Sequence, residues 1–168
     1  MNHLEALTKE WLEYPGYFCR TTVRVGKRAK GGWDGELDVV GFHPDRKHFL
    51  HVECSLDAWS WEKRQKTFSK KFEIGRQYAT DFFRGLEVED ELDQVVLHGY
   101  ASAPEKHRSI GSGRLLTVSE LFAEILSVLP RKFAKAAVPE NYPLIRTLQL
   151  AKSVTDDVTV PEHQMIPR

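Results

Sequence analysis

From its sequence, the chain is expected to be a single α/β domain in which helices flank a mixed central β-sheet, and three observations predict this fold class. The length of 168 residues suits one domain. The composition, with 41% apolar and 29% charged residues, is typical of globular proteins. Helical and extended patterns alternate along the chain, which indicates helices packed on a sheet. We expect residues 1–155 to form the domain and residues 156–168 to form a loose C-terminal tail.

The first half of the chain is expected to form a helix, three strands and a second, longer helix. Leu4, Leu7 and Trp11 have helical spacing, and Pro15 follows the first helix. The strand patterns are rich in β-branched and aromatic residues, and a short turn joins the second strand to the third as a hairpin. The expected bounds are 3–14 for the first helix, 17–25, 36–42 and 48–55 for the strands, and 57–83 for the long helix, capped by Asp57 or Ser60.

The second half of the chain is expected to complete the sheet and to cover it with two helices. Thr117 and Glu120 form a capping box that opens the first of these helices. Pro143 suits the first position of the second helix. The expected bounds are 94–101 and a short segment ending at 116 for the strands, and 117–129 and 143–154 for the helices.

The composition and the N-terminal residues exclude several classes of protein. No apolar run approaches the roughly 18–20 residues that span a bilayer. The first residues are charged throughout and lack the apolar region of a secretory signal. Cys19 and Cys54 show neither disulfide nor metal spacing and are interpreted as thiols in a reducing compartment. We therefore expect a cytoplasmic protein that has no membrane partner.

The charges balance overall, with 24 basic and 24 acidic residues, but they are unevenly distributed. Two stretches are basic and contain no acidic residue. The first holds Arg20, Arg24, Lys27, Arg28 and Lys30, and the second holds Lys63, Arg64, Lys66, Lys70 and Lys71. Each stretch alone is typical of a solvated face, but two of them flanking an acidic site favour a nucleic-acid partner.

Acidic side chains are expected to gather on the hairpin of the second and third strands. Residues two apart on a strand share a face, so Glu36 and Asp38 project together, as do His51, Glu53 and Ser55. If the hairpin is in register, Asp38 and Glu53 lie side by side. Two such carboxylates repel each other unless a cation lies between them, and oxygen ligands suit Mg²⁺ or Mn²⁺. The alternative is a pair of surface carboxylates on a solvated sheet face.

The order of these elements and the motifs GELDVVGF and HFLHVECS resemble the PD-(D/E)XK nuclease superfamily, in its restriction-endonuclease-like and Holliday-junction-resolvase-like branch. The resemblance covers about residues 3–83. It implies a restriction-endonuclease-like core in αβββαβ order with additional C-terminal helices. It also implies metal-dependent hydrolysis of phosphodiester bonds, with DNA as the expected substrate. Many members of the superfamily form dimers, so the resemblance allows a homodimer.

The resemblance also implies roles for individual carboxylates. Asp38 matches the metal-binding Asp of the second strand, and Glu53 matches the Glu of the Glu-x-Lys motif. Glu5 matches the metal-binding Glu of the first helix. Glu36 matches a further Glu, which acts as a ligand through water or as an orienting group. With Mg²⁺ or Mn²⁺ bound, these side chains would activate a water molecule against a phosphodiester.

One position departs from the superfamily pattern, because Ser55 stands where the motif has Lys. A hydroxyl group supplies no positive charge, although it could contact the water or a phosphate. Three outcomes are open: the lysine has migrated to the following helix, another cation serves, or the site is inactive. In the last case the chain would bind nucleic acid or a protein partner without cleaving it.

The periodicity of the long helix identifies a candidate for a migrated lysine. At about 100° per residue, Lys71 and Arg64 lie on the flank of the buried stripe, whereas Lys63, Lys66 and Lys70 face away from it. We expect Lys71 to replace the motif lysine and Arg64 to bind phosphate; the alternative is that both side chains extend along the core towards solvent.

The remaining candidates have weaker signals. His51 shares a face with Glu53 and could be a ligand, a general base or a partly buried strand histidine. Gln77 occupies a helix position where some branches of the superfamily have Gln. The glycine-rich loop at 26–32 is expected to track a nucleic-acid backbone. Its cations, with one from the preceding strand, are Arg24, Lys27, Arg28 and Lys30.

Overall fold

A computed structural model of the protein describes residues 2–86, 92–100, 106–132, 136–154 and 165–166. Its elements are α1 (His3–Glu13), β1 (Phe18–Lys27), β2 (Trp33–His43), β3 (His48–Ser55), α2 (Trp61–Tyr78), the 3₁₀ helix η1 (Ala79–Phe83), β4 (Asp93–His98), β5 (Ser109–Ile110), β6 (Gly113–Thr117), α3 (Val118–Val128) and α4 (Pro143–Val154). The order of α1, three strands, α2 and β4 is the predicted one. Within the described ranges, no helix is both long and apolar enough to cross a membrane.

The strands form one mixed sheet of six strands in the order β1-β2-β3-β4-β6-β5. The pairs β1–β2, β2–β3 and β5–β6 are antiparallel, whereas β4 is parallel to both β3 and β6. Because parallel neighbours need a long connection, α2 carries the chain from β3 across the sheet to β4. The predicted α/β class, with a mixed sheet flanked by helices, is therefore confirmed.

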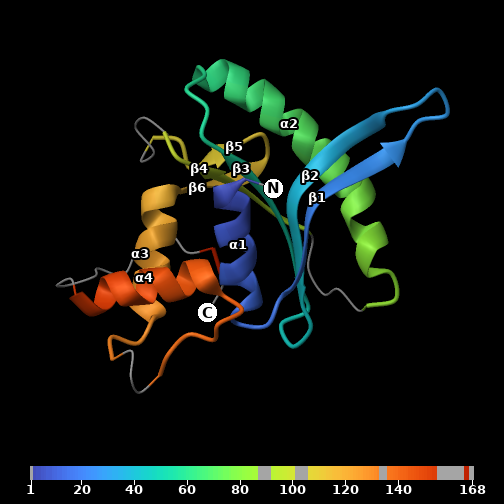
Figure 1. Ribbon diagram of the computed structural model, residues 1–168. Coiled ribbons are helices and arrows are strands. Elements are labelled where there is room, and N and C mark those ends of the chain that lie inside the picture. The colour runs from blue at the N-terminus through green and yellow to red at the C-terminus, as the bar shows by residue number, and fades with distance from the viewer. Residues whose placement is uncertain (1, 87–91, 101–105, 133–135, 155–164, 167–168) are drawn as a thin grey trace.

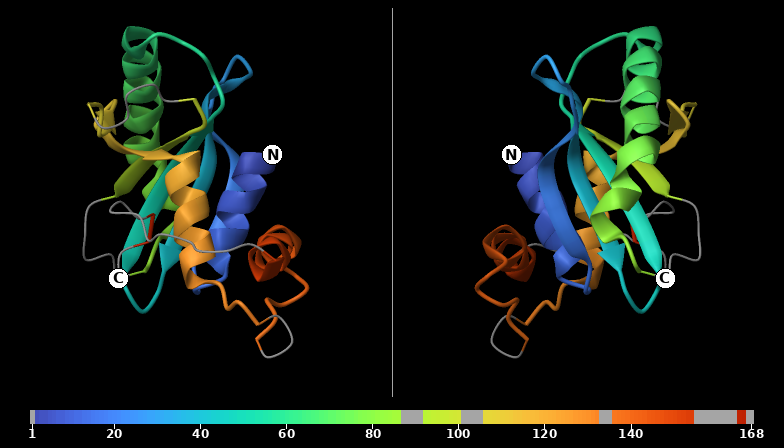
Figure 2. Two further views of the ribbon diagram at one scale, coloured as in Figure 1. Left: turned by 90° about the vertical axis from the view of Figure 1, so that its left-hand side faces the viewer. Right: turned by 90° about the vertical axis from the view of Figure 1, so that its right-hand side faces the viewer.

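The helices cover both faces of the sheet, with α1, α3 and α4 on one face and α2 on the other (Figures 1 and 2). The alternation of β3 agrees with this arrangement. Leu50, Val52 and Cys54 join the apolar cluster under α1, α3 and α4. His51 points the other way, and the centre of its ring lies 5.5 Å from that of Phe72 on α2. The α2 face of the sheet is therefore the one that carries Glu53, the candidate acidic residue of β3.

The β1–β2 hairpin is longer than the sequence predicts. Its pairing continues to Lys27 and Trp33, which shortens the expected loop. Near its end, Gly26 has a φ of +65°, and a Cβ atom there would lie 2.6 Å from Cγ of Asp34. Only glycine fits this position without strain. The result is a two-stranded arm that projects beyond the rest of the sheet (Figure 1).

The long helix and the capping box largely follow the sequence prediction. Of the two proposed caps, Ser60 is the N-cap of α2, and its Oγ accepts the N–H of Lys63 at 3.3 Å. The segment after Tyr78 is a 3₁₀ helix rather than the expected continuation of α2. At the start of α3, Thr117 Oγ1 accepts the N–H of Glu120 at 3.1 Å, and the Glu120 carboxylate accepts the N–H of Thr117 at 2.8 Å. The predicted capping box is thus confirmed.

Part of the C-terminal tail is packed against the domain, in contrast to the expected loose tail. Met165 is fully buried in the cluster under α3. Its N–H donates to the Glu124 carboxylate, and its carbonyl accepts from Arg114 at 2.8 Å. The sequence gives no periodic signal for such a contact, because it depends on two side chains from distant elements. Tail residues 156–164 and 167–168 lie outside the described residues.

The close approach of α2 to the sheet depends on Gly75. A Cβ atom at this position would clash with Nδ1 of His51 and lie 3.0 Å from Nε2 of Gln94. We expect Gly75→Ala to lower the free energy of unfolding by about 1–3 kcal/mol through overpacking, although alanine favours a helix by about 1 kcal/mol. Urea denaturation measures this change. The exposed α2 residue Glu73 supplies the control, and Glu73→Ala should change the value by less than about 0.5 kcal/mol. A more stable Gly75→Ala protein would contradict the prediction.

Candidate functional site

The candidate site lies where β2 and β3 stop pairing. The last pair in this direction is Val39 with Val52, and the next positions along the two strands are Asp38 and Glu53. The N–H of Cys54 donates to Oδ2 of Asp38 at 2.9 Å, so a side chain rather than a strand carbonyl satisfies it. Asp38 has 9% of its surface exposed and Glu53 has none. The two carboxylates therefore come from adjacent strands and are held in a largely desolvated position.

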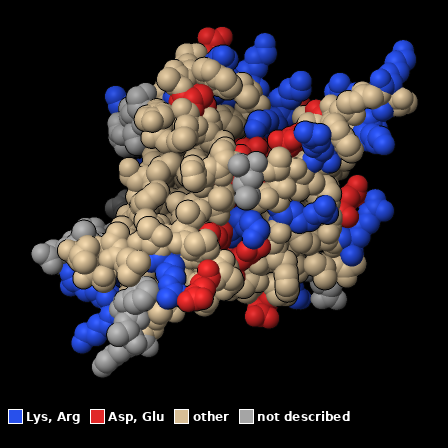
Figure 3. All heavy atoms as spheres, viewed as in Figure 1, with Lys and Arg blue, Asp and Glu red and all other residues tan. Residues whose placement is uncertain are grey.

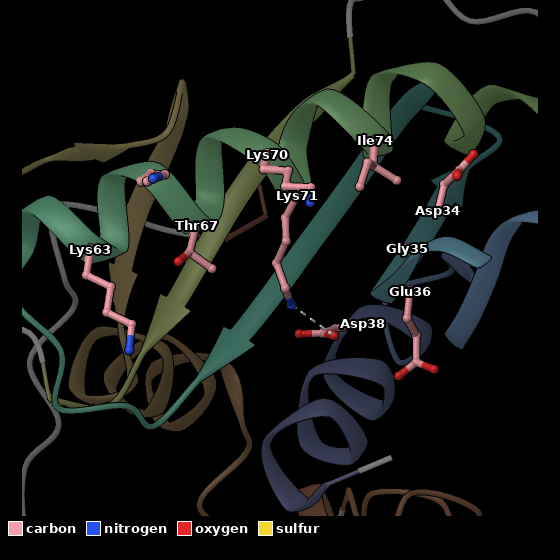
Figure 4. A pocket seen from close by; sticks show the side chains of 10 residues that line it. Asp34, Gly35, Glu36, Asp38, Lys63, Thr67, Lys70, Lys71 and Ile74 are labelled. Atoms are coloured by element: carbon pink, nitrogen blue, oxygen red, sulfur yellow. Dashed lines mark ion pairs between the residues drawn. The ribbon is translucent and has the colours of Figure 1, made fainter. Parts of the chain in front are cut away.

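Lys71 reaches these two carboxylates from α2. Its ammonium group forms an ion pair with Oε2 of Glu53 and lies 3.6 Å from Oδ1 of Asp38. Figure 4 shows the side chain extending from the helix across to Asp38. The structure thus brings together three of the predicted site residues, with Lys71 in the place from which a migrated lysine could act.

The charges of this group are strongly coupled. Burial raises the pKa of Asp38 to about 7, and the neighbouring charge of Glu53 acts in the same direction. Burial also raises the pKa of Glu53, but a hydrogen bond from His51 and the charge of Lys71 outweigh it and hold that pKa below its usual value. Burial lowers the pKa of Lys71, yet the two carboxylates outweigh burial and raise it. Lys71 therefore acts as a fixed positive charge near neutral pH.

A chain of hydrogen bonds orients Glu53 from behind. Gln94 Oε1 accepts from Arg76 at 2.6 Å, so its Nε2 faces Nδ1 of His51 at 3.3 Å and the carbonyl of Phe72 at 2.9 Å. Since Arg can only donate, this bond fixes the orientation of the Gln94 amide. Nδ1 of His51 then accepts, and Nε2 donates to Oε1 of Glu53 at 2.8 Å. Of the three roles considered for His51, its position fits a buried strand histidine that holds Glu53.

Glu5 lies on α1 and is held by residues other than the carboxylate pair. Its Oε1 accepts from Asn2 at 2.6 Å, and its Oε2 accepts from Thr22 Oγ1 at 3.4 Å. Among the described residues, no three His, Cys, Asp or Glu side chains are close enough to hold a metal ion. The expected set of Asp38, Glu53 and Glu5 is therefore not gathered into one three-carboxylate site. The periodicity of α1 gives the phase of Glu5 but not its distance from the sheet.

Ser55 and Arg64 belong to a separate cluster around Asp57. Ser55 Oγ donates to Oδ2 of Asp57, and Arg64 Nε donates to Oδ1 at 3.1 Å. His98 Nε2 lies 3.2 Å from Oδ2 of the same residue. These contacts and the bond to the Trp59 N–H outweigh the effect of burial and lower the pKa of Asp57 to about 2. Arg64 has only 3% of its surface exposed, so its position does not support the phosphate contact that the helix phase predicts.

The other predicted residues lie on the surface around the site. Gln77 is exposed on α2, and it is Gln94 of β4 that contacts His51. Glu36 is exposed and pairs with Arg24 at 3.3 Å. The described residues thus place neither Gln77 nor Glu36 among the side chains that contact Asp38 or Glu53.

The cations of the hairpin arm are exposed. Arg24 and Arg28 lie on the arm and each pairs with an acidic residue of β2, Arg28 with Asp34 at 2.8 Å. Lys27 and Lys30 are also exposed at its end. Figure 3 shows Lys and Arg side chains gathered over this arm and over α2, with acidic side chains between the two groups. The predicted backbone-tracking loop is therefore available on the surface.

The site opens into a cleft of about 620 Å³ between α2 and β2. Asp38 and Lys71 lie on its walls, whereas the fully buried Glu53 lies behind them. A phosphate group entering the cleft would meet the Lys71 side chain and the exposed part of the Asp38 carboxylate.

The carboxylate pair fits a Mg²⁺ ion held by few protein ligands. Mg²⁺ is commonly bound by one or two carboxylates, several waters and substrate phosphates. Asp38 and Glu53 supply two such carboxylates from adjacent strands. The residues present are therefore compatible with Mg²⁺ or Mn²⁺ when substrate supplies further oxygen ligands.

Several residues of the site were not predicted from the sequence. Gln94 is buried at the start of β4, where a polar residue before an apolar run was a usable signal. Thr22 of β1 donates to Glu5 and has a φ of +53°, a backbone conformation that the sequence does not indicate. The sequence predicts Asp57 as a possible helix cap, and it does not indicate the ion cluster that forms around this residue. His98 carries no sequence signal that connects it to Asp57.

Comparison of the chain with protein-family models, with curated proteins and with solved structures gives no match in any of the three. The site therefore has to be interpreted from its own geometry.

The raised pKa of Asp38 predicts a specific dependence of stability on pH. The ordinary value is 3.8 and the folded value about 7, so the folded state binds this proton more tightly than the unfolded state does. The stabilisation of the folded state by this proton is complete below about pH 4 and is lost as the pH rises through 7. In metal-free buffer, we expect the free energy of unfolding of the wild type to fall by about 2–3 kcal/mol between pH 5 and pH 8, at about 1.4 kcal/mol per pKa unit. Asp38→Asn should not show this fall.

Urea unfolding of both proteins at several pH values measures this difference. The exposed turn residue Asp45 provides a matched control, because Asp45→Asn should follow the wild-type curve. Parallel curves for wild type and Asp38→Asn would show that Asp38 is ionised normally.

Proposed function

We propose that the chain is a metal-dependent nuclease of the PD-(D/E)XK type, with a restriction-endonuclease-like core, that hydrolyses the phosphodiester bonds of DNA. The observation that carries the proposal is the position of Lys71. It approaches Asp38 and Glu53 from the following helix and so offers the positive charge that Ser55 lacks. The αβββαβ order and the exposed cations on the hairpin arm support it further.

Each side chain of the group has a chemical role in this proposal. Asp38 and Glu53 hold the divalent ion, which when bound polarises the phosphate and lowers the pKa of a water molecule. Lys71, as a fixed cation, orients the attacking water and stabilises the negative charge that develops on the phosphate oxygens. His51 donates to Oε1 of Glu53, and Oε2 is directed at Lys71. Glu5, which accepts hydrogen bonds from Asn2 and Thr22, is assigned no direct contact with the ion in this proposal.

A second function, binding of nucleic acid without cleavage, is favoured by one observation. Among the described residues the carboxylates do not form a three-residue metal cluster, and Lys71 already neutralises part of their charge. In such a protein Lys71 would be a structural ion-pair partner. The two functions differ in whether Mg²⁺ binds to the carboxylate pair.

Cleavage assays on three variants test the proposal. We expect Asp38→Asn to abolish Mg²⁺-dependent cleavage of DNA, because a metal ligand is lost. We expect Lys71→Ala to lower the rate by about 10²–10³-fold, the usual effect of removing one group that stabilises developing charge. The exposed Lys132 offers the control, and Lys132→Ala should cleave like wild type.

The outcomes separate the two functions. Wild-type protein that cleaves no single-stranded, duplex or branched DNA and no RNA, with either Mg²⁺ or Mn²⁺, would reject the nuclease. Calorimetric titration of the same protein with Mn²⁺ would then decide whether the carboxylate pair binds a cation at all.

A further inference from the structure

One wall of the cleft beside Asp38 is built from lysine side chains. Lys63, Lys66 and Lys70 line it from α2, on the same side of the helix as Lys71. Figure 4 shows Lys63 and Lys71 both extending downward from α2, with Lys71 reaching Asp38 of β2. Positions 63, 66 and 70 are three and four residues apart, so their side chains follow one another along one edge of the helix. The lysines that face away from the core therefore face the cleft.

The acidic side chains of the opposite wall already have partners. Asp34 accepts from Arg28 at 2.8 Å and from the Tyr78 hydroxyl at 2.7 Å. Glu36 pairs with Arg24 at 3.3 Å. Asp34 and Glu36 thus have cations of the hairpin arm beside them and do not neutralise the lysine wall.

The lysines of this wall have no acidic partners among the described residues. In the part of the chain that the structure describes, Lys63, Lys66 and Lys70 form no ion pair, and Lys66 and Lys70 are exposed. Lys63 has an aromatic neighbour instead, with its ammonium group 4.0 Å from the Trp59 ring centre. Three like charges along a concave surface attract a polyanion and raise its local concentration. Figure 3 shows the resulting group of basic side chains over α2.

We propose that Lys63, Lys66 and Lys70 bind successive phosphates of one nucleic-acid strand and lead that strand to Asp38. The inference rests on the proposed nuclease function and names the surface that holds its substrate. Seven residues of helix rise about 10.5 Å, and one DNA strand advances about 3.4 Å per nucleotide, so the wall spans about three nucleotides. Such contacts fix the position of the strand without reading its sequence.

Salt dependence of DNA binding tests this proposal. Binding is measured in EDTA, where no metal-dependent cleavage occurs, by fluorescence anisotropy of a labelled duplex and of a labelled single strand. Each phosphate contact contributes about 0.9 to the slope of log K against log salt for duplex DNA and about 0.7 for a single strand. We expect Lys63→Ala, Lys66→Ala and Lys70→Ala combined to reduce the slope by about 2–3. The affinity lost between 50 and 200 mM salt should then shrink by about 16–64-fold.

Single variants provide the matched comparison. Lys66→Ala should reduce the slope by about 0.7–0.9, whereas Lys132→Ala, also an exposed lysine, should leave it unchanged. Comparing the two DNA forms shows which of them occupies the wall. A triple variant that keeps the wild-type slope on both DNA forms would overturn the proposal, and so would wild-type protein that binds neither form.

Failure here differs from failure of the nuclease. If cleavage is absent but the slope changes as expected, the wall binds nucleic acid in a protein that does not cleave it. If cleavage occurs and the triple variant keeps the wild-type slope, the substrate approaches by another surface.

Discussion

One ammonium group between two carboxylates, at the point where two strands stop pairing, is the interaction on which the rest of this site depends. Asp38 can leave the β2–β3 ladder because its side chain satisfies the N–H of Cys54. Glu53 can be fully buried because His51 and Lys71 both donate to it. Removing Lys71 would take away the cation that pairs with both desolvated carboxylates, which is more costly than the loss of a surface ion pair.

The same constraint explains how α2 is placed. The helix has to bring Lys71 to Asp38 and also pack on the sheet, and Gly75 permits the close approach one turn further along by leaving room for His51. The near side of α2 therefore carries an apolar stripe with Phe68 and Phe72, and its edge carries Lys71. The remaining lysines follow that edge, so the helix that brings Lys71 to Asp38 also carries a row of lysines along the cleft.

The distribution of charge also gives meaning to the balanced composition. A chain with equal numbers of acidic and basic residues has no overall attraction for nucleic acid. Ion pairs on the hairpin arm neutralise Asp34 and Glu36 of β2, while Lys63, Lys66 and Lys70 form no ion pair within the described part of the chain. A local positive surface beside an acidic centre arises from pairing and not from composition. In the proposed function, this surface would attract phosphate beside the carboxylates that would hold the metal ion.

The sequence by itself determined the order of the elements, the faces of β3 and the flank of α2 on which Lys71 lies, because these follow from periods of two and about 3.6 residues. It also determined the capping box of Thr117, which is a local interaction. Only the tertiary structure decided that Arg64 turns inward to Asp57, that Gln94 rather than Gln77 supports His51, and that Glu5 stays with Asn2 and Thr22. Periodicity gives the direction of a side chain from its own element. The partner it meets depends on the distance and angle between elements, which are set by the packing of the whole domain.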